Sequence, residues 1–533
     1  LGADDERPEF PTITWFTMLF SAGMGIGMLF FGVAEPMKHY LKPPSIPGES
    51  LSAAGNSLGI TLFHWCLHPW ALYAIVALAL AYFGFRRNLP LSFRSVFYPL
   101  IGKQIYRWPG HIIDILAVLA TLFGLATSLG LGAKQINAGL NYVFGIPQET
   151  WVQIIIIACV TSMAVASLVS GLHVGIRRLS EGNMILAGLL LLFLFVVGPT
   201  IFLCNSMVNN IGEYVQTLSS KSFWTAAYEG EKQADWLSTW TVFYWGWCIA
   251  WSPFVGMFIA RVSKGRTIRE FLIGVLLVPS SVAVVWMTGF GNTAIHQETY
   301  KKLAGANAEV DAGYNYSAKK YKVQVEDPKH KLPLTSDEKW LVAPDAKDVA
   351  FPKGILAKAD KDGVLITKDG IKVVYKRRVL VNKKDGLPYN PSKESLYTGK
   401  YKYKEKNLTI GGYLTESVLN ENATAKVDTL ATAMFVMLKA YPFASITALI
   451  GVLSVILFFV TSSDSASMVA DIIASGGSED PTTGTRLFWG ILEGCLAAVL
   501  LLSGGLVELK TGSIIIGLPF FIIIIFQNYK LKG

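Results

Sequence analysis

The chain has 533 residues, of which 52% are hydrophobic and only 16% are charged. Ordinary soluble domains carry roughly 25% charged residues, so this composition excludes a soluble multidomain protein and indicates a surface that faces lipid. The net charge of +9 does not indicate nucleic-acid binding, because the lysines concentrate in one polar segment and at the ends of apolar segments.

Ten segments are long and apolar enough to cross a bilayer, for which a helix needs about 20 residues. They lie at residues 12–34, 58–85, 112–133, 151–173, 183–206, 239–262, 271–297, 440–463, 487–506 and 511–528. Basic clusters follow the second, fourth, sixth and tenth segments, at residues 86–87, 177–178, 261–269 and 530–532. The positive-inside rule then places these ends in the cytoplasm and predicts a multi-pass protein of the plasma (inner) membrane.

The spans can be divided into two halves of five. Residues 1–206 would form the first half, and residues 239–297 with 429–533 the second. Inverted repeats of this kind are common in secondary transporters. Residues 207–238 are predicted to be an amphipathic connecting segment.

A long polar insert, residues 298–428, separates the seventh and eighth spans and is predicted to lie outside the cell. Alternating stretches at 363–367 and 371–381, bounded by Asp-Gly turns, predict strands. The insert is therefore interpreted as a small β-rich or partly disordered cap, or as a domain that binds a solute or a partner.

Three glycines, Gly23, Gly25 and Gly27, lie at alternate positions in the first span. Each destabilises a helix by roughly 1 kcal/mol relative to alanine. The cluster predicts either a helix break, whose freed carbonyls or amides bind an ion or solute, or close packing against another helix.

Aromatic residues gather in the second and sixth spans: Trp65, Trp70, Tyr73, Trp240, Tyr244, Trp247 and Trp251. The spacing in the sixth span places its four rings on one helix face, and Pro69 should bend the second span. Stacked aromatics can cage a quaternary ammonium group through cation–π attraction of about 0.5–2 kcal/mol per ring, or they can simply pack. No cationic residue is evident beside them, which favours a solute without a carboxylate.

Hydroxyl residues crowd the predicted end of the eighth span: Thr461, Ser462, Ser463, Ser465 and Ser467. They could ligate sodium together with backbone carbonyls, or bond back to the helix. Asp464 beside them is a candidate functional residue, as acids within membrane spans often are. The chain has no nucleotide-binding loop, nucleophile elbow or convincing metal-ligand spacing, since the pair His64 and His68 has no third ligand, so we do not expect an enzyme.

Four segments, at residues 23–36, 64–73, 240–271 and 458–467, together resemble the betaine/choline/carnitine transporter family. The resemblance covers nearly all membrane segments and excludes the insert. It implies an all-α membrane protein with a LeuT-type core of two inverted five-helix repeats, carrying a polar, β-containing extracellular insert. It also implies a homotrimer, and a chain that lacks the first two of the family's twelve helices.

The resemblance also implies site residues. An aromatic box for the solute would comprise Trp65, Trp70, Tyr73, Tyr244, Trp245, Trp247 and Trp251. One sodium ion would be held by Ser21, Met24, Phe458, Thr461 and Ser462, and a second by Thr121 and Phe254. Cys248 stands where the family usually has a second tryptophan, Leu125 stands in place of a sodium-site threonine, and Asn183 stands where sodium-independent exchangers have arginine.

We therefore predict a sodium-coupled symporter for a methylated ammonium compound such as betaine, choline, carnitine or trimethylamine, with sodium ions as coupling ions and no organic cofactor. A proton-coupled or sodium-independent carrier of the same solutes is the alternative. A solute receptor or osmosensor with little transport is the alternative from another class.

Overall fold

The computed structural model describes residues 1–2, 5–48, 50–170, 177–298, 429–478 and 482–528, together with strands β1–β7 between residues 322 and 406. At positions 21–24 and at a few helix ends only the backbone is described. Two compact units are distinguished: residues 1–294 with 417–533, and residues 295–416.

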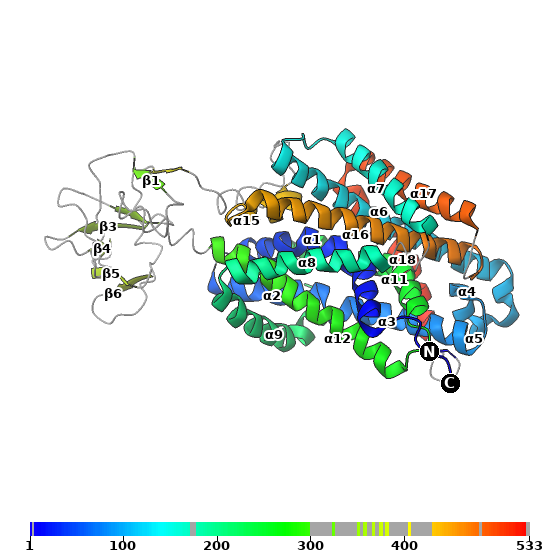
Figure 1. Ribbon diagram of the computed structural model, residues 1–533. Coiled ribbons are helices and arrows are strands. Elements are labelled where there is room, and N and C mark those ends of the chain that lie inside the picture. Colours follow the sequence, from blue (N-terminus) through cyan, green and yellow to red (C-terminus); the bar gives the residue numbers. More distant parts are fainter. Residues whose placement is uncertain are drawn as a thin grey trace. The chain divides into compact units, whose positions relative to one another are not determined.

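The first unit is helical. Its longer helices are α1 (Thr12–Leu41), α2 (Leu51–Trp65), α3 (Leu67–Ala81), α6 (Trp108–Phe144), α7 (Thr150–Ser170), α8 (Arg177–Val197), α9 (Thr200–Ser222), α11 (Phe243–Val262), α12 (Ile268–Met287), α15 (Thr429–Leu438), α16 (Ala444–Ala474), α17 (Thr483–Gly504) and α18 (Leu506–Asn528). Shorter pieces are α4 (Phe93–Val96), α5 (Tyr98–Ile101), α10 (Glu231–Leu237), the 3₁₀ turn η2 (Gly102–Tyr106) and the π turns η1 (Tyr82–Arg86), η4 (Ser238–Val242) and η5 (Thr288–Asn292). Most of the long helices run along one direction (Figure 1).

Within the described part of the chain, nine helices are long and apolar enough to cross a membrane, or ten if a bent pair counts as one span. The bent pair is α1, whose segments Thr12–Phe20 and Gly25–Leu41 meet at 60°. The bend falls in the glycine cluster, where the helix is weakest. The structure therefore agrees with the prediction of a helical membrane protein.

Several predicted boundaries are wrong, among them the end of the third span, 112–133, which continues to Phe144 as α6. The predicted fifth span, 183–206, ends early: α8 stops at Val197, and α9 begins at Thr200. Pro199 lies between them and cannot continue the helix, because it has no backbone N–H and its ring clashes with the preceding turn. The predicted eighth span, 440–463, instead continues to Ala474 as α16, so Thr461 and Ser462 lie inside the helix rather than at its end.

The N-terminal segment lies against the basic ends of the second and sixth spans. Arg86 donates to the carbonyl oxygen of Gly2 at 2.9 Å. Arg261 pairs with Glu9 at 2.7 Å, and Lys264 with Glu6 at 3.0 Å. These contacts place both basic clusters at one end of the bundle, as the charge pattern requires of ends that share one side of the membrane.

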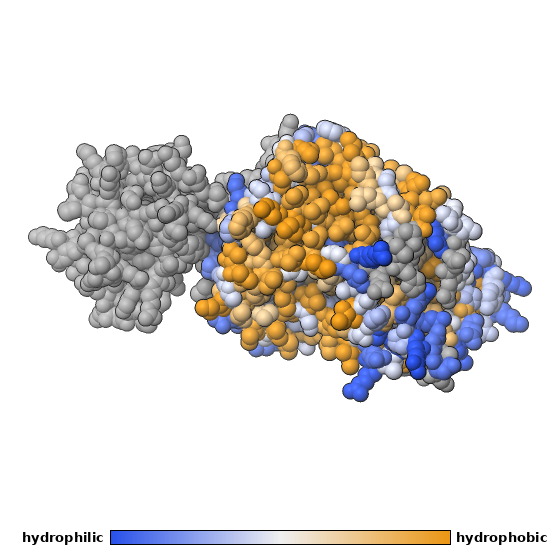
Figure 2. All heavy atoms as spheres, in the orientation of Figure 1, coloured by the Kyte–Doolittle hydropathy of each residue, from blue (hydrophilic) through white to orange (hydrophobic). Residues whose placement is uncertain are grey.

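Apolar side chains cover a broad area of the helical unit, and polar ones gather toward the end that carries the N-terminus (Figure 2). On α8, Ile185 is 63% exposed and Val196 is 69% exposed. Exposed aliphatic side chains in such numbers suit contact with lipid rather than water.

The second unit contains antiparallel strands. A five-stranded meander is formed by β2 (Val349–Phe351), β3 (Ile355–Ala359), β4 (Leu365–Thr367), β5 (Lys372–Lys376) and β6 (Val379–Asn382), and a separate pair by β1 (Lys322–Val325) and β7 (Tyr403–Lys406). The register pairs Val374 with Val381. Most of the predicted insert, 298–428, lies outside the described residues.

Candidate functional site

One stripe of α1 faces α2 and α11. Gly27, Phe31, Glu35 and His39 follow one another at intervals of four residues, which places them on one helix face. All four are buried. At Gly27 a Cβ atom would lie 2.6 Å from Cη2 of Trp65 and 2.9 Å from Cη2 of Trp247. Only glycine therefore lets the backbone of α1 approach these two indoles.

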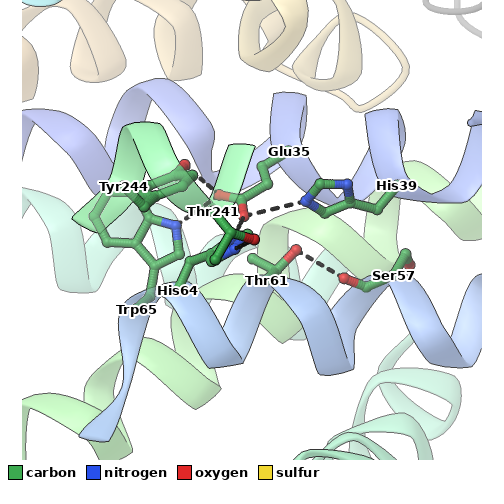
Figure 3. A network of polar contacts seen from close by, with 8 residues as sticks. All are labelled: Glu35, His39, Ser57, Thr61, His64, Trp65, Thr241 and Tyr244. Atoms are coloured by element: carbon green, nitrogen blue, oxygen red, sulfur yellow. Dashed lines mark hydrogen bonds and ion pairs between the residues drawn. The ribbon is translucent and has the colours of Figure 1, made fainter. Parts of the chain in front are cut away.

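Glu35 is the centre of a buried hydrogen-bond network (Figure 3). Its Oε2 accepts hydrogen bonds from Nε1 of Trp65 at 2.7 Å and from the hydroxyl of Tyr244 at 2.5 Å. Its Oε1 lies 2.7 Å from Nδ1 of His64 and 3.3 Å from Nε2 of His39. The carboxylate thus gathers groups from α1, α2 and α11.

The histidine protons can be assigned from this network. An ionised carboxylate only accepts hydrogen bonds, so Nδ1 of His64 and Nε2 of His39 each carry a proton. Nε2 of His64 lies within hydrogen-bond distance, 3.0 Å, of Oγ1 of Thr241. The buried carboxylate is then satisfied by four donors.

The rings around Glu35 form the first part of an aromatic cluster. Phe31 lies 6.1 Å from Trp65, 5.6 Å from Tyr244 and 6.3 Å from Trp247, measured between ring centroids. Trp65 meets Trp247 edge to face at 6.2 Å. The structure therefore brings together three of the predicted box residues and adds Phe31, which the sequence did not single out.

The remaining box residues lie farther along α3 and α11. Trp70 and Tyr73 form an edge-to-face pair with centroids 5.7 Å apart. Trp251 stacks on Trp247 at 5.5 Å and 9°. Cys248 is buried on α11, which packs against α3, at the position where a cage wall was expected.

Two buried indoles have an N–H group that donates no hydrogen bond to the described residues. Nε1 of Trp70 and Nε1 of Trp251 have no hydrogen-bond partner among the described residues. Buried donors are usually paired. These N–H groups could therefore donate to a polar atom of a bound solute.

The interruption of the second span lies at Cys66 rather than at Pro69. α2 ends at Trp65 and α3 begins at Leu67. Pro69 is the cause, because it cannot donate to the carbonyl of Trp65 four residues earlier, whereas proline is tolerated in the first turn of α3.

Trp245 and His68 lie at the edge of the Glu35 cluster, where Trp245 meets His64 edge to face at 6.0 Å between ring centroids. The rings of Trp245 and His68 stack at 5.5 Å, and His68 is 3.0 Å from the hydroxyl of Ser222. The pair His64 and His68 therefore does not converge on one site. Trp245, predicted as part of the box, also packs edge-on against Phe63 at 5.3 Å.

A cation does lie beside the aromatic rings, contrary to the sequence-based expectation. Nζ of Lys510, on α18, is 4.4 Å from the ring centroid of Phe243 and 5.8 Å from that of Trp240. Phe243 in turn stacks on Trp247 at 5.7 Å. The prediction failed because Lys510 is distant in sequence from the aromatic spans and reaches them only through the packing of α18 on α11.

The predicted sodium ligands of α16 lie where α16 packs against α1 and α8. A Cβ atom on Gly25 would lie 1.9 Å from Cδ1 of Phe458, so α1 and α16 are in close contact there. Oγ1 of Thr461 donates back to the carbonyl of Leu457 at 3.0 Å. The hydroxyl of Ser462 is buried and has no hydrogen-bond partner within the described part of the chain.

Residues of the second predicted sodium site lie on α6 and α11. Thr121 is buried, and its hydroxyl also lacks a partner among the described residues. Phe254 is 0% exposed and lies 5.8 Å from Trp251, between ring centroids. Leu125 is buried on α6. The side chains of Ser21, Gly23 and Met24 lie outside the described part.

Asn183 faces the same region of α16. Exchanging its amide oxygen and nitrogen lets it donate to the carbonyl of Ser454 at 3.3 Å and accept from the backbone N–H of Phe458 at 3.0 Å. A neutral amide here brings no positive charge near Thr461 and Ser462, so nothing about Asn183 repels a cation at these hydroxyls.

One cluster within the described residues has ligand atoms close enough for a metal ion. Single ligand atoms of Glu35, His39 and His64 lie within 4.8 Å of one another. Imidazole and carboxylate suit zinc and related metals. Both oxygens of Glu35 already accept hydrogen bonds, however, so a metal would have to displace these donors.

Sequence reasoning missed Glu35, His39, Phe31 and Thr241. Signals for three of them were present: an acid inside an apolar span, and a period of four along α1. We singled out Trp65 and considered His64 only as half of a metal pair, although both contact Glu35.

The chain matches the family described as BCCT, betaine/carnitine/choline family transporter, over residues 1–323 and 409–532. A glycine betaine/proline/choline transporter of Vibrio parahaemolyticus is 36% identical over 551 residues, covering 100% of this chain and 77% of the relative. The glycine betaine transporter OpuD of Bacillus subtilis is 37% identical, covering 98% and 79%. An uncharacterized transporter of Mycobacterium tuberculosis is 37% identical, covering 100% and 70%.

Proposed function

Because the chain belongs to the betaine/carnitine/choline family of membrane transporters, we propose that it is a sodium-coupled symporter for a methylated ammonium solute. The solute would bind between α2, α3 and α11, beside the bend of α1. Sodium would bind where α1 meets α16. Movement of one group of helices against the other would then expose the two sites to either side of the membrane in turn.

The proposed class of solute, a methylated ammonium compound, is supported by the aromatic cluster and by the carboxylate of Glu35 that is hydrogen-bonded to it. Trp65 and Trp247 lie against Gly27, Tyr244 lies 5.4 Å from Trp65 between ring centroids, and Glu35 accepts hydrogen bonds from Trp65 and Tyr244. A quaternary ammonium group is attracted to ring faces, and a nearby negative charge adds to that attraction. Ordinary core packing would not require an anion at this place.

Buried hydroxyl oxygens without a hydrogen-bond partner support sodium as the coupling ion. The hydroxyls of Ser462 and Thr121 are buried without a partner among the described residues, and such atoms normally find one. Sodium takes oxygen ligands, and a neutral Asn183 nearby does not repel it. These features fit sodium coupling better than sodium-independent exchange.

Solutes with and without a carboxylate both suit the cluster. Lys510, 4.4 Å from the Phe243 ring centroid, supplies a cation for the carboxylate of betaine or carnitine. The unused N–H groups of Trp70 and Trp251 would serve a carboxylate or the hydroxyl of choline. Betaine and choline are therefore the first candidates.

The proposed oligomeric state, repeats and orientation in the membrane rest on the family resemblance and on the charge pattern. The chain would form a homotrimer in the inner membrane. Its core would be two inverted repeats, residues 1–206 and 239–297 with 429–533, and the insert at 298–428 would lie outside.

A binding screen tests the proposal. Betaine, choline, carnitine, trimethylamine, glycine and taurine are titrated into purified protein by calorimetry, in sodium and in potassium buffer. We expect binding of one or more methylated ammonium compounds in sodium only, and none of glycine or taurine. Binding that is equal in both buffers would overturn sodium coupling. Sodium-dependent binding without flux in vesicles would indicate a receptor.

A further inference from the structure

Glu35 is joined to two walls of the proposed cage, and nothing in the proposed transport cycle requires it to be an acid. Its side chain is fully buried. Four donors from three helices contact its two oxygens, at 2.5–3.3 Å. Burying a charge is costly unless it is fully hydrogen-bonded, and here each oxygen accepts two hydrogen bonds.

The indole of Trp65 is fixed at two opposite edges. Its Nε1 donates to Glu35 at 2.7 Å. Its six-membered ring lies against the backbone of α1, where a Cβ on Gly27 would come within 2.6 Å of Cη2. An indole held at both ends cannot rotate about its side-chain bonds without breaking the hydrogen bond or colliding with α1.

Tyr244 is fixed in the same way. Its hydroxyl donates to Oε2 of Glu35 at 2.5 Å. Its ring stacks on the imidazole of His64, with centroids 4.5 Å apart and planes 14° apart. His64 is itself held between Glu35 and Thr241, so one carboxylate determines the positions of both rings (Figure 3).

The charge of Glu35 also affects the ring faces. A hydrogen bond from an N–H or O–H group to an anion polarises the donor, and chains of such bonds strengthen one another at low dielectric. The electron density of Trp65 and Tyr244 is thereby raised, which strengthens their attraction to a cation. An uncharged solute of the same shape gains little from this effect.

We propose that Glu35 is a positioning residue of the ammonium cage: it holds Trp65 and Tyr244 in place and biases their faces toward a cation over an uncharged isostere. This inference rests on the proposed function, because it concerns the same site.

The test compares choline with its uncharged carbon isostere, 3,3-dimethyl-1-butanol, by calorimetry in sodium buffer. Glu35→Gln keeps the size of the side chain and removes the charge. Glu493→Gln is the matched control, because Glu493 is also fully buried and accepts from one hydroxyl, Ser467 at 2.6 Å, on a different part of the bundle.

We expect Glu35→Gln to weaken choline binding by about tenfold or more and to weaken binding of the isostere much less, so that the preference for choline falls. Glu493→Gln should leave both affinities within about twofold of wild type. An unchanged preference for choline in Glu35→Gln would overturn the inference, as would an equal loss in Glu493→Gln.

If Glu35→Gln does not fold, the same measurement is made on Tyr244→Phe, which removes the hydroxyl that donates to Glu35 and keeps the ring. It should weaken choline binding by about threefold or more, and unchanged affinity would overturn the inference. Failure of the proposed function has a different signature: wild-type protein would then bind neither choline nor any other methylated ammonium compound.

Discussion

Trp65 and Glu35 lie on different helices, 30 residues apart in the chain, and are joined by a 2.7 Å hydrogen bond from the indole Nε1 to Oε2. The bond links the aromatic cluster to the part of α1 that follows the bend. A change in the bend of α1 would therefore move Glu35, and with it the rings that we propose hold the solute.

The stacked tryptophans of α11 give the first prediction. Trp247 stacks on both Phe243 and Trp251, so Trp247→Ala removes a ring from the centre of the cluster. We expect loss of choline and betaine binding by about tenfold or more, measured by calorimetry. Trp489→Ala is the control, because Trp489 lies on α17 and packs edge to face on Phe488. Equal effects of the two variants would mean that the rings only pack.

The hydroxyls of α16 give the second prediction. Thr461→Ala and Ser462→Ala each remove a proposed sodium ligand. Each should raise the sodium concentration that gives half-maximal solute uptake, by about threefold to tenfold. Ser454→Ala is the matched control, since Ser454 is buried on the same helix and bonds back to the carbonyl of Ile450 at 2.8 Å. An unchanged sodium dependence would remove Thr461 and Ser462 from the site.

The third prediction concerns the glycines of α1. Gly27→Ala should lower the free energy of unfolding by about 1–3 kcal/mol. The new Cβ would overlap Trp65 and Trp247, and these packed rings cannot move away from it. Thermal unfolding of detergent-solubilised protein measures the change. Gly188→Ala, in open space on α8, should be neutral or stabilising; a loss of similar size there would argue against the packing account.

A substitution at Gly25 also tests whether the glycines of α1 are required for close packing. Its Cβ would overlap the ring of Phe458. The cost of Gly25→Ala should therefore be smaller when Phe458→Ala is present, and a double-mutant cycle on the unfolding temperature measures this coupling. Additive effects would contradict the predicted contact between α1 and α16.

The fourth prediction concerns the loop after α11. The guanidinium of Arg266 lies 4.1 Å from the ring centroid of Trp15 and donates to the carbonyl of Phe10 at 2.8 Å. Arg266→Lys keeps the charge but loses the planar stacking and the fork of donors. We expect a loss of about 1–2 kcal/mol in stability. The exposed Arg269 is the control, and Arg269→Lys should change little.

Much of the fold could be predicted from the sequence, because apolar length and flanking charge report membrane spans directly. Gly23, Gly25 and Gly27 predicted either a break or close packing, and the structure shows both a 60° bend in α1 and close packing at Gly25 and Gly27; the face of α11 followed from the spacing of Tyr244, Trp247 and Trp251. Helix ends were less predictable: α16 continues past its hydroxyl-rich stretch to Ala474, and the positive φ angles that end it occur at Gly476 and Gly477.

The site was predicted in part. The box tryptophans carry a strong local signal, so Trp65 and Trp247 were found. Glu35 and Lys510 were not, because their roles depend on which helices pack together: Glu35 meets Tyr244 across 209 positions of sequence. No local pattern reports such a contact.

Uptake into proteoliposomes tests the central claim most directly. Labelled choline and labelled betaine are offered to vesicles with an inward sodium gradient, and to vesicles in which potassium replaces sodium. We predict that at least one of the two solutes accumulates above its external concentration only with the sodium gradient, and that Trp247→Ala abolishes this accumulation. Equal uptake of both solutes with and without sodium would contradict the account.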